Sequence, residues 1–539
     1  MANNFKNVVD INIWRQVTPA PGAHAAGMGI ASDLRNDLSR NPHVYQLLSA
    51  TVLNRYNIVT KGWGFVVSPA LAGTFGAGSG CVFAPSMGLV GVISGGNTTS
   101  AVVLSTPLPT AVAPNMLANR GGSGEYGFRA RIIGSSAGGS GKVEERWIVG
   151  NSGGATPKLN LDTPLSFVPQ SGDTYEILAG RVFMLGAGAL AAGSWKSYEV
   201  ATNTLASKSQ TNLPATIATD FASVALDEQY VPYDNVPGEG FVVGAGTYDG
   251  GSKRCLTATA IAANTITGQV SAGDASVVAN EYRNFQIRIV EDATTPTAVG
   301  QRRVIASHTA GASPVYTLGS SWTVNPSATS KFVIEYPNLI ILRTSAQMGT
   351  YTYNYGAAAI NNGTNTIATD AWSTTYFAAI GSAHAAGCMM FPSFGIKPDA
   401  GKNARHSYLY HFRGGATTLD LFDIAGGTAG TWTLGISYDG NGMMTPGAGS
   451  CGCSATVGNE GRATYINGYT ASQLSQIFRF DVKNRVLSPY TPTDWIQSGT
   501  ATVGDRLAAF VAVDGADKYD VVLMMSHLSA ISQELVAVI

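Results

Sequence analysis

The stretch Phe128-Arg-Ala-Arg-Ile132 decides the fold, because it recurs as Phe285-Gln-Ile-Arg-Ile289 at an offset of 157 residues. In both copies large apolar residues alternate with polar or small ones, a period typical of a half-buried β-strand. An offset that stays constant over several segments indicates a duplicated unit, and we predict two β-modules, at 64–194 and 240–350, with one strand order. The further segments at this offset are Arg146-Trp-Ile148 with Arg303-Val-Ile305, Pro169 with Pro326, Tyr175-Glu-Ile177 with Phe332-Val-Ile334, and Phe183-Met-Leu185 with Ile340-Ile-Leu342.

The rest of the chain also has the pattern of an all-β protein. Its 539 residues include 64 Gly, and Val, Thr, Tyr and Ile fall in short alternating runs, as in Tyr351-Thr-Tyr-Asn-Tyr355 and Tyr408-Leu-Tyr-His-Phe412. Such runs between turn-forming residues are typical of strands. Only Asp33 to Leu53 fits a helix as well as a strand. We therefore predict the all-β class.

A second family of repeats surrounds the two modules. Strands are predicted to begin at residues 351, 408, 464 and 519, at spacings of 57, 56 and 55 residues. A unit of this length, with three or four strands and an anchoring Trp, has the size of one propeller blade. The residues that we predict to anchor blades are Trp14, Trp63, Trp372, Gly414, Gly415, Trp432 and Trp495.

One of these units carries a fuller pattern. It reads Phe412-Arg-Gly-Gly415, then Leu419-Asp-Leu-Phe-Asp423, then Thr431-Trp432. These residues resemble a blade of kelch-type propellers. The resemblance implies that the Gly pair permits a tight hairpin and that the Trp packs between neighbouring sheets. The other predicted blades lack the Gly pair.

We therefore expect a kelch-like β-propeller interrupted by two duplicated β-domain insertions. Glu534 to Ile539 is expected to pair with strands near the N-terminus, because an unclosed ring would leave a sheet edge open to unwanted pairing. The predicted parts are an N-terminal blade at 1–63, the first insert at 64–194, a blade at 195–239, the second insert at 240–350, and the remaining blades with the closure at 351–539.

The charge of the chain excludes some classes of function. It has 33 basic and 34 acidic side chains and a net charge of -1, which argues against general nucleic-acid binding and polybasic membrane binding. Charged residues make up only 12%, against about a quarter in typical domains, which suggests a surface partly covered by copies or partners. The sequence has no secretion signal and no apolar run long enough for a membrane anchor. Its five Cys form neither a disulfide framework nor a zinc set.

One motif matches a serine-hydrolase pattern. Gly150-Asn-Ser-Gly-Gly154 has the form GxSxG, yet the duplicate has Ser307-His-Thr-Ala-Gly311 in its place. No strand-to-helix elbow surrounds Ser152, and no His and Asp partners can be assigned. We interpret the motif as a polar hairpin and expect the protein not to be an enzyme.

Two glycine-rich loops and the histidines give no stronger signal. Gly186-Ala-Gly-Ala-Leu-Ala191 lacks the helix of a dinucleotide loop, and Gly138-Gly-Ser-Gly-Lys142 is followed by Val143 where a phosphate loop needs Ser or Thr. His24 and His384 occupy repeated positions, which favours a structural role. We assign no catalytic residue, no metal ligand and no cofactor.

Trp147 and Trp322 are the candidate interface residues. Trp is enriched at protein interfaces. These two do not match each other across the duplicated modules, so they are less constrained as framework residues than the predicted blade anchors.

Taken as a whole, the chain resembles virion structural proteins of tailed bacteriophages. The features that support this resemblance are the low charge, the duplicated Gly- and Thr-rich β-modules, and the segment Gly300-Gln-Arg-Arg-Val-Ile305, which is followed by a Gly turn, a Trp and Pro326. The resemblance implies a tail or neck component (nozzle, sheath or appendage) that assembles as a symmetric multimer for DNA passage or host attachment. Collar, head decoration and fibre roles stay open.

The resemblance also implies partners and a location. The partners are copies of the chain, portal, adaptor, tail or fibre proteins, and DNA that passes through without specific binding. The location is the virion, after synthesis in the host bacterial cytoplasm. The alternative is a carbohydrate-binding or adhesive β-propeller with the inserts as recognition domains. The missing secretion signal favours the virion.

Overall fold

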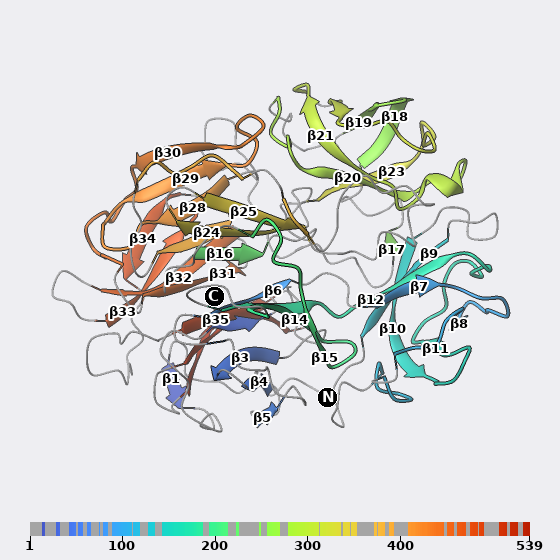
Figure 1. The fold of residues 1–539 in the computed structure, drawn as a ribbon, viewed down its shortest axis with the longest axis horizontal. Coiled ribbons are helices and arrows are strands. Elements are labelled where there is room, and N and C mark those ends of the chain that lie inside the picture. Colours follow the sequence, from blue (N-terminus) through green and yellow to red (C-terminus); the bar gives the residue numbers. More distant parts are fainter. Residues whose placement is uncertain are drawn as a thin grey trace.

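The computed structural model shows an all-β protein, as the sequence predicted (Figure 1). Among the described residues the one helical element is η4 (Pro296–Ala298), a single 3-10 turn, and no helix there is long and apolar enough to cross a membrane. The structure describes residues 13–16, 29–32, 43–49, 52–57, 62–65, 75, 79–84, 89–109, 112–118, 128–134, 143–186, 193–213, 222–225, 247–248, 256–269, 279–311, 313–335, 338–344, 347–352, 371–373, 376–382, 388–392, 408–446, 450–457, 461–469, 475–482, 484–489, 506–514, 518–526 and 532–538.

Six antiparallel four-stranded sheets form the body of the described chain. Sheet 1 contains β2 (Ile30–Ser32), β3 (His43–Ser49), β4 (Val52–Asn57) and β5 (Gly62–Phe65). Sheet 2 contains β6 (Gly80–Ala84), β13 (Arg181–Leu185), β14 (Trp195–Glu199) and β15 (Thr204–Ser207). Sheet 3 contains β16 (Ala222–Ala225), β24 (Asn338–Thr344), β25 (Gln347–Thr352) and β26 (Ala371–Trp372).

The other three sheets come from the C-terminal part of the chain. Sheet 4 contains β27 (Met389–Pro392), β28 (Tyr408–Phe412), β29 (Leu419–Asp423) and β30 (Thr431–Ile436). Sheet 5 contains β31 (Cys451–Val457), β32 (Gly461–Tyr469), β33 (Ser475–Asp481) and β34 (Val486–Pro489). Sheet 6 contains β35 (Arg506–Asp514), β36 (Lys518–Ser526), β37 (Ser532–Val538) and β1 (Ile13–Gln16).

The first strands of the six sheets lie next to one another in a cycle. β2 contacts β6, which contacts β16, followed by β27, β31 and β35, and β35 returns to β2. At the contact of β2 with β6, the Gly29 amide donates to the Ser79 carbonyl at 2.8 Å. A Cβ on Gly29 would overlap the backbone nitrogen of Cys81, so Gly permits this close approach.

The N-terminal strand completes the last sheet. β1 pairs antiparallel with β37, and Arg15 lies opposite Glu534. This confirms the pairing predicted for Glu534 to Ile539. The outermost strand of sheet 6 therefore comes from the other end of the chain and covers the edge of β37.

Two further units lie on the same side of the six sheets (Figure 1). The first module contains β7 (Leu89–Val92), β8 (Ala101–Val103), β9 (Arg129–Ile133), β10 (Val143–Asn151), β11 (Lys158–Leu161) and β12 (Thr174–Leu178), and β17 (Thr247–Tyr248) pairs with β10. The second module contains β18 (Leu256–Ala262), β19 (Thr265–Gln269), β20 (Gln286–Glu291), β21 (Arg302–His308), β22 (Val315–Leu318) and β23 (Lys331–Glu335).

The two modules share one strand order, which confirms the prediction from the constant offset. The first runs β7-β12-β9-β10-β11-β8 and the second β18-β23-β20-β21-β22-β19. Pairing of β18 with β19 closes the second module into a barrel. In the first module a bridge between Ile93 and Leu104 joins the ends of β7 and β8.

The sheets divide the chain differently from our sequence boundaries. β6 and β13 pair with each other within sheet 2 although the first module lies between them in sequence, and β16 pairs with β24 around the second module. Each module thus connects the first and second strands of a sheet, a long-range pairing that local patterns do not reveal. The stretch Asp33 to Leu53 fitted a helix as well as a strand. Its described part is strand, because β3 and β4 form a hairpin there.

Each module shares its hydrophobic core with neighbouring sheets. The core of the second module continues into Met348 of sheet 3 and Phe422 of sheet 4, and that of the first module into Tyr45 and Val182 of sheets 1 and 2. The Asn284 side chain of the second module donates to the carbonyls of Ile424, at 2.7 Å, and Gly427, at 3.0 Å. The modules are therefore packed parts of the body.

Candidate interaction site

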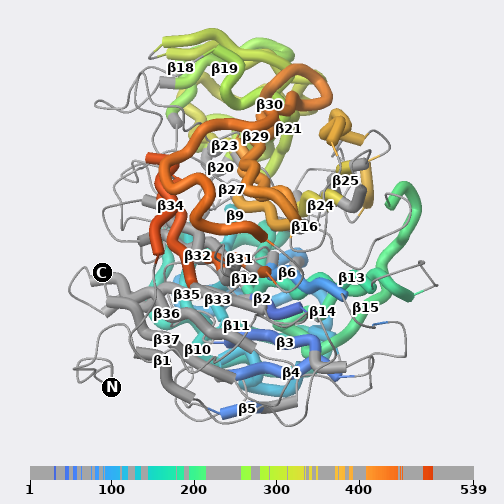
Figure 2. The backbone as a smooth tube through the Cα atoms, turned by 90° about the vertical axis from the view of Figure 1, so that its left-hand side faces the viewer, coloured from blue at the N-terminus to red at the C-terminus, as the bar shows by residue number. Residues whose placement is uncertain are grey.

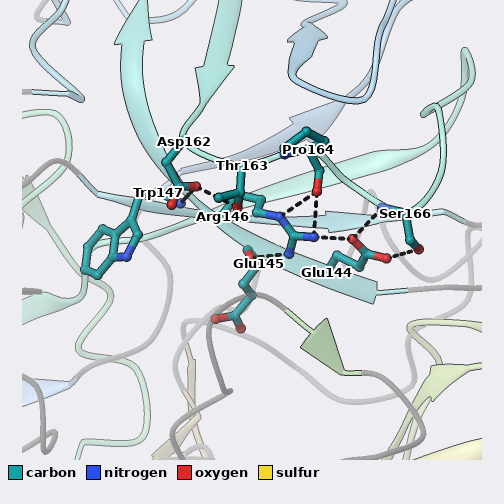
Figure 3. A network of polar contacts seen from close by, with 8 residues as sticks. All are labelled: Glu144, Glu145, Arg146, Trp147, Asp162, Thr163, Pro164 and Ser166. Atoms are coloured by element: carbon teal, nitrogen blue, oxygen red, sulfur yellow. Dashed lines mark hydrogen bonds and ion pairs between the residues drawn. The ribbon is translucent and has the colours of Figure 1, made fainter.

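Strand β10 is the centre of the candidate site, because its side chains point alternately to its two sides (Figure 3). Glu144 and Arg146 point toward the loop between β11 and β12. Glu145 and Trp147 point to the other side. One side of the strand thus fastens a loop, and the other carries an ion-pair network with Trp147 at its rim.

Arg146 holds the loop between β11 and β12 in place (Figure 3). Its Nε and Nη2 donate to the Pro164 carbonyl at 3.1 and 2.9 Å, and Nη1 donates to the Glu145 carbonyl at 2.8 Å. Nη2 also pairs with the Glu144 carboxylate at 2.8 Å. That carboxylate accepts hydrogen bonds from the backbone and the hydroxyl of Ser166. A buried arginine with these partners acts as a latch.

The second module repeats this latch with uncharged partners. Arg303, the counterpart of Arg146, donates from Nε to the Ser321 carbonyl at 2.8 Å and from Nη1 to the Arg302 carbonyl at 2.7 Å. Gln301 replaces Glu144, and its side-chain oxygen accepts the backbone amide of Thr323 at 2.9 Å. Because both copies retain these contacts, the arginine at this position has a structural role.

A buried ion-pair network lies on the other side of β10. Arg131 pairs with Glu145 at 3.0 Å and with Glu176 at 2.9 Å, and Arg129 lies 3.3 Å from Glu145. All four side chains are almost fully buried, so each charge requires its partners. The second module has Arg302 and Val333 at the positions of Glu145 and Glu176. The network is therefore specific to the first module.

Trp147 lies on the outer side of β10. Its ring is half-buried, with the Arg129 guanidinium 5.4 Å from the ring centroid. Two residues further along β10, Val149 is 58% exposed, and Val304, the counterpart of Trp147, is 37% exposed. These two valines were not predicted from the sequence, although the alternation along β10 and β21 places them on the outer side.

Trp322 lies in the core of the second module. It is 6% exposed, packs in that core, and has the Arg303 guanidinium 5.5 Å from its ring centroid. Its counterpart at the same offset is Leu165, which is also buried. Little of the indole surface is available to a partner, so the candidate interface now centres on Trp147.

The predicted blade anchors lie at contacts within and between sheets. Trp372 is buried with its ring 5.2 Å from that of Trp195 in sheet 2. Trp432 is half-buried, lies 4.9 Å from the Phe422 ring, and donates from Nε1 to the Ala378 carbonyl at 2.8 Å. Trp195 was not among the anchors predicted from the sequence.

Fewer contacts are described for the remaining predicted anchors. The half-buried Trp63 lies 5.1 Å from the Tyr56 ring, and Trp14 lies in β1. Gly414 and Gly415 follow β28, where Gly415 has a φ of 74° that favours glycine. Trp495 lies outside the described residues.

The serine of the GxSxG motif lies in the hairpin between β10 and β11. The Ser152 hydroxyl accepts the Lys158 amide at 2.9 Å, and the Ser152 amide donates to the Lys158 carbonyl at 2.9 Å. In the second module the Thr309 hydroxyl accepts the Val315 amide at 2.9 Å in the same way. The hydroxyl therefore satisfies a turn amide in both copies, as expected for a polar hairpin.

One buried cluster of ionisable groups lies in sheet 4. The Asp420 carboxylate contacts His411 Nδ1 at 3.3 Å and Arg413 Nη2 at 2.7 Å. Burial lowers the pKa of His411, against the opposing effect of Asp420. Within the part of the chain that the structure describes, no group of three or more His, Cys, Asp or Glu side chains is arranged to hold a metal ion.

Known proteins add little to this description. No family model matches the chain. A search of curated proteins also finds no match.

Similar solved structures exist, but at very low similarity. A mutant of AofleA from Arthrobotrys oligospora is 6% identical, with 98% of this chain and 90% of that chain covered and a TM-score of 0.31. A protein of unknown function from Bacteroides thetaiotaomicron is 8% identical, with coverage of 74% and 94% and a TM-score of 0.22. The GH74 enzyme of Niastella koreensis is 11% identical, with coverage of 94% and 90% and a TM-score of 0.17. At these scores the similarities carry no argument about fold or function.

Proposed function

We propose that the six sheets form a propeller with one sheet per blade. The cyclic contacts of β2, β6, β16, β27, β31 and β35 support this arrangement. So does the pairing of β1 with β37, which joins the two ends of the chain in one sheet. The kelch-like pattern at Phe412 to Trp432 then corresponds to the blade of sheet 4.

We further propose that the protein is a structural component of a bacteriophage virion, in its tail or neck, and assembles there as a symmetric multimer. The observation that carries the proposal is the way the two modules are built in. Each shares a hydrophobic core with two sheets, and an arginine latch fastens a loop within each. A body with two rigid projections suits a component that bears load between neighbours.

A ring of six blades would limit the routes by which DNA can pass. β2 and β6 are in direct backbone contact at Gly29 and Ser79. Six first strands, each packed directly against the next, would enclose a centre narrower than a DNA duplex. We therefore propose that a passage, where present, runs along an axis shared by several copies.

Purified virions give the test. Particles from a lysate that contains this gene product are banded in a density gradient and digested for quantitative mass spectrometry. The proposal expects the chain at a constant copy number per capsid. Absence from the particles, together with binding of the purified protein to a glycan array, would instead support the adhesive propeller.

A further inference from the structure

One face of the second module, formed by β18, β19 and β22, has no charged residue on those strands; a charge at its edge is Lys331 in β23, opposite Thr257. Its outward side chains on β18, β19 and β22 are all exposed or half-buried. We call them the Thr face; they are Thr257, Thr259, Ala260, Ala262, Thr265, Thr267, Val315 and Thr317.

The Thr face is a regular, rigid surface. Thr265 lies opposite both Ala262 and Thr317, and Thr267 lies opposite Ala260 and Val315, so the side chains form rows across three strands. The alternating inward residues are buried in the core of the module. Figures 1 and 2 both place β18 and β19 at the end of the molecule farthest from sheet 1. A second large body can therefore approach this face.

The first module shows that the fold does not require an uncharged face. At the positions of Val315 and Thr317 it has Lys158 and Asn160, both exposed. It also has the exposed Asp162 at the position of Gly319. The two modules share strand order, latch and hairpin contacts, so this difference lies in the surface alone.

The chemistry of the face indicates what covers it. Within the face, a charged partner such as nucleic acid or an acidic peptide finds no complementary charge, and at its edge it finds Lys331 alone among the β23 residues paired with β18. A Thr hydroxyl both donates and accepts hydrogen bonds, so a Thr-rich face is complementary to itself. We propose that the Thr face binds the Thr face of a second copy across a two-fold axis. This inference rests on the multimer part of the proposed function.

The size of the face sets the strength of the contact. The strands β18, β19 and β22 have 7, 5 and 4 residues. At about 3.3 Å per residue and about 4.8 Å between strands they cover roughly 250 Å² per copy. A stable interface buries about 800 Å² per partner. The contact is therefore weak, and free molecules form it only at high concentration, whereas copies held side by side by other contacts form it readily.

Sedimentation velocity of the full chain, from dilute solution to the solubility limit, tests the proposal. The wild type is expected to shift from monomer to dimer as concentration rises. Thr317→Lys and, separately, the more exposed Thr259→Lys each place a cation from both copies in an interface that offers no opposite charge, and each is expected to weaken dimerisation by at least about tenfold. The matched control is Asn160→Lys, at the position of Thr317 in the first module, and it should dimerise like the wild type.

Two outcomes would overturn the inference. One is a wild type that stays monomeric at every concentration, and the other is dimerisation that persists unchanged in both variants. Neither bears on whether the chain is found in virions, so failure of this inference is distinguishable from failure of the proposed function.

Discussion

Trp14 in β1 lies directly opposite Leu535 in β37, so the first described strand and the last are neighbours in one sheet. Antiparallel opposite residues have Cα atoms about 4.5–5.5 Å apart, within the range that a disulfide can span. The variant Trp14→Cys/Leu535→Cys should therefore form a cross-link. Because it would close a loop of almost the whole chain, it should raise the free energy of unfolding by up to about 4 kcal/mol.

Mobility on a non-reducing gel and chemical denaturation measure both effects. Trp14→Cys/Ser532→Cys is the control, since its two positions are not opposite each other. Equal cross-linking of the two variants, or none in the first, would contradict the closure.

Replacing the two latch arginines should lower the stability of the protein by different amounts. Arg146→Met leaves the buried Glu144 carboxylate without its 2.8 Å ion-pair partner. This should lower the free energy of unfolding by about 3–5 kcal/mol. Arg303→Met breaks hydrogen bonds to a backbone carbonyl and to the side chains of Thr323 and Gln301. This should lower the free energy of unfolding by about 1–3 kcal/mol. Urea denaturation of the two variants gives the comparison. A larger loss for Arg303→Met would show that Glu144 does not depend on Arg146.

The Ser152 hydroxyl should behave as a turn residue. Ser152→Ala removes one hydrogen bond to the Lys158 amide and should cost about 1 kcal/mol. Thr309→Ala removes the equivalent bond in the second module and should cost about the same. Esterase and peptidase assays of wild type and Ser152→Ala complete the test, because hydrolysis that depended on Ser152 would be incompatible with this role.

His308 should make the protein less stable in mild acid. Its Nε2 accepts the Tyr282 amide at 2.9 Å, which requires a neutral ring. Burial lowers the pKa of His308 below its ordinary 6.5. Below pH 6.5 the unfolded chain therefore binds a proton that the folded chain does not, and stability must fall as the pH falls.

The matched variant for this pH dependence is His308→Asn, which installs the residue of the first module, Asn151. Its Oδ1 accepts the Leu117 amide at 2.9 Å in the equivalent contact. Denaturation midpoints between pH 8 and pH 5 should fall less steeply in the variant than in the wild type. Identical slopes would exclude His308 as a source of the dependence.

The sequence predicted the parts of the fold that depend on local pattern. The constant offset aligned β9 to β13 with β20 to β24, and the spacing near 56 residues marked β28, β32 and β36, the second strands of sheets 4, 5 and 6. It could not place β6 beside β13, because a whole module separates them in sequence. For the same reason it assigned β13 and β24 to the inserts.

The candidate site was predictable only in part. Trp147 was chosen by residue type and lies at the outer side of β10, whereas Trp322 was chosen by the same rule and is buried. Residue type does not report which side of a strand faces the core. Comparison with the duplicate does not separate them either, because the counterparts Leu165 and Val304 are both apolar, although the first is buried and the second exposed.

Electron cryomicroscopy of purified virions tests the central claim most directly. The account predicts several symmetry-related copies of one density in the tail or neck, each with a ring of six sheets and two barrel-like projections on one side. A reconstruction of the complete particle at side-chain resolution in which every density is explained by other proteins would contradict it.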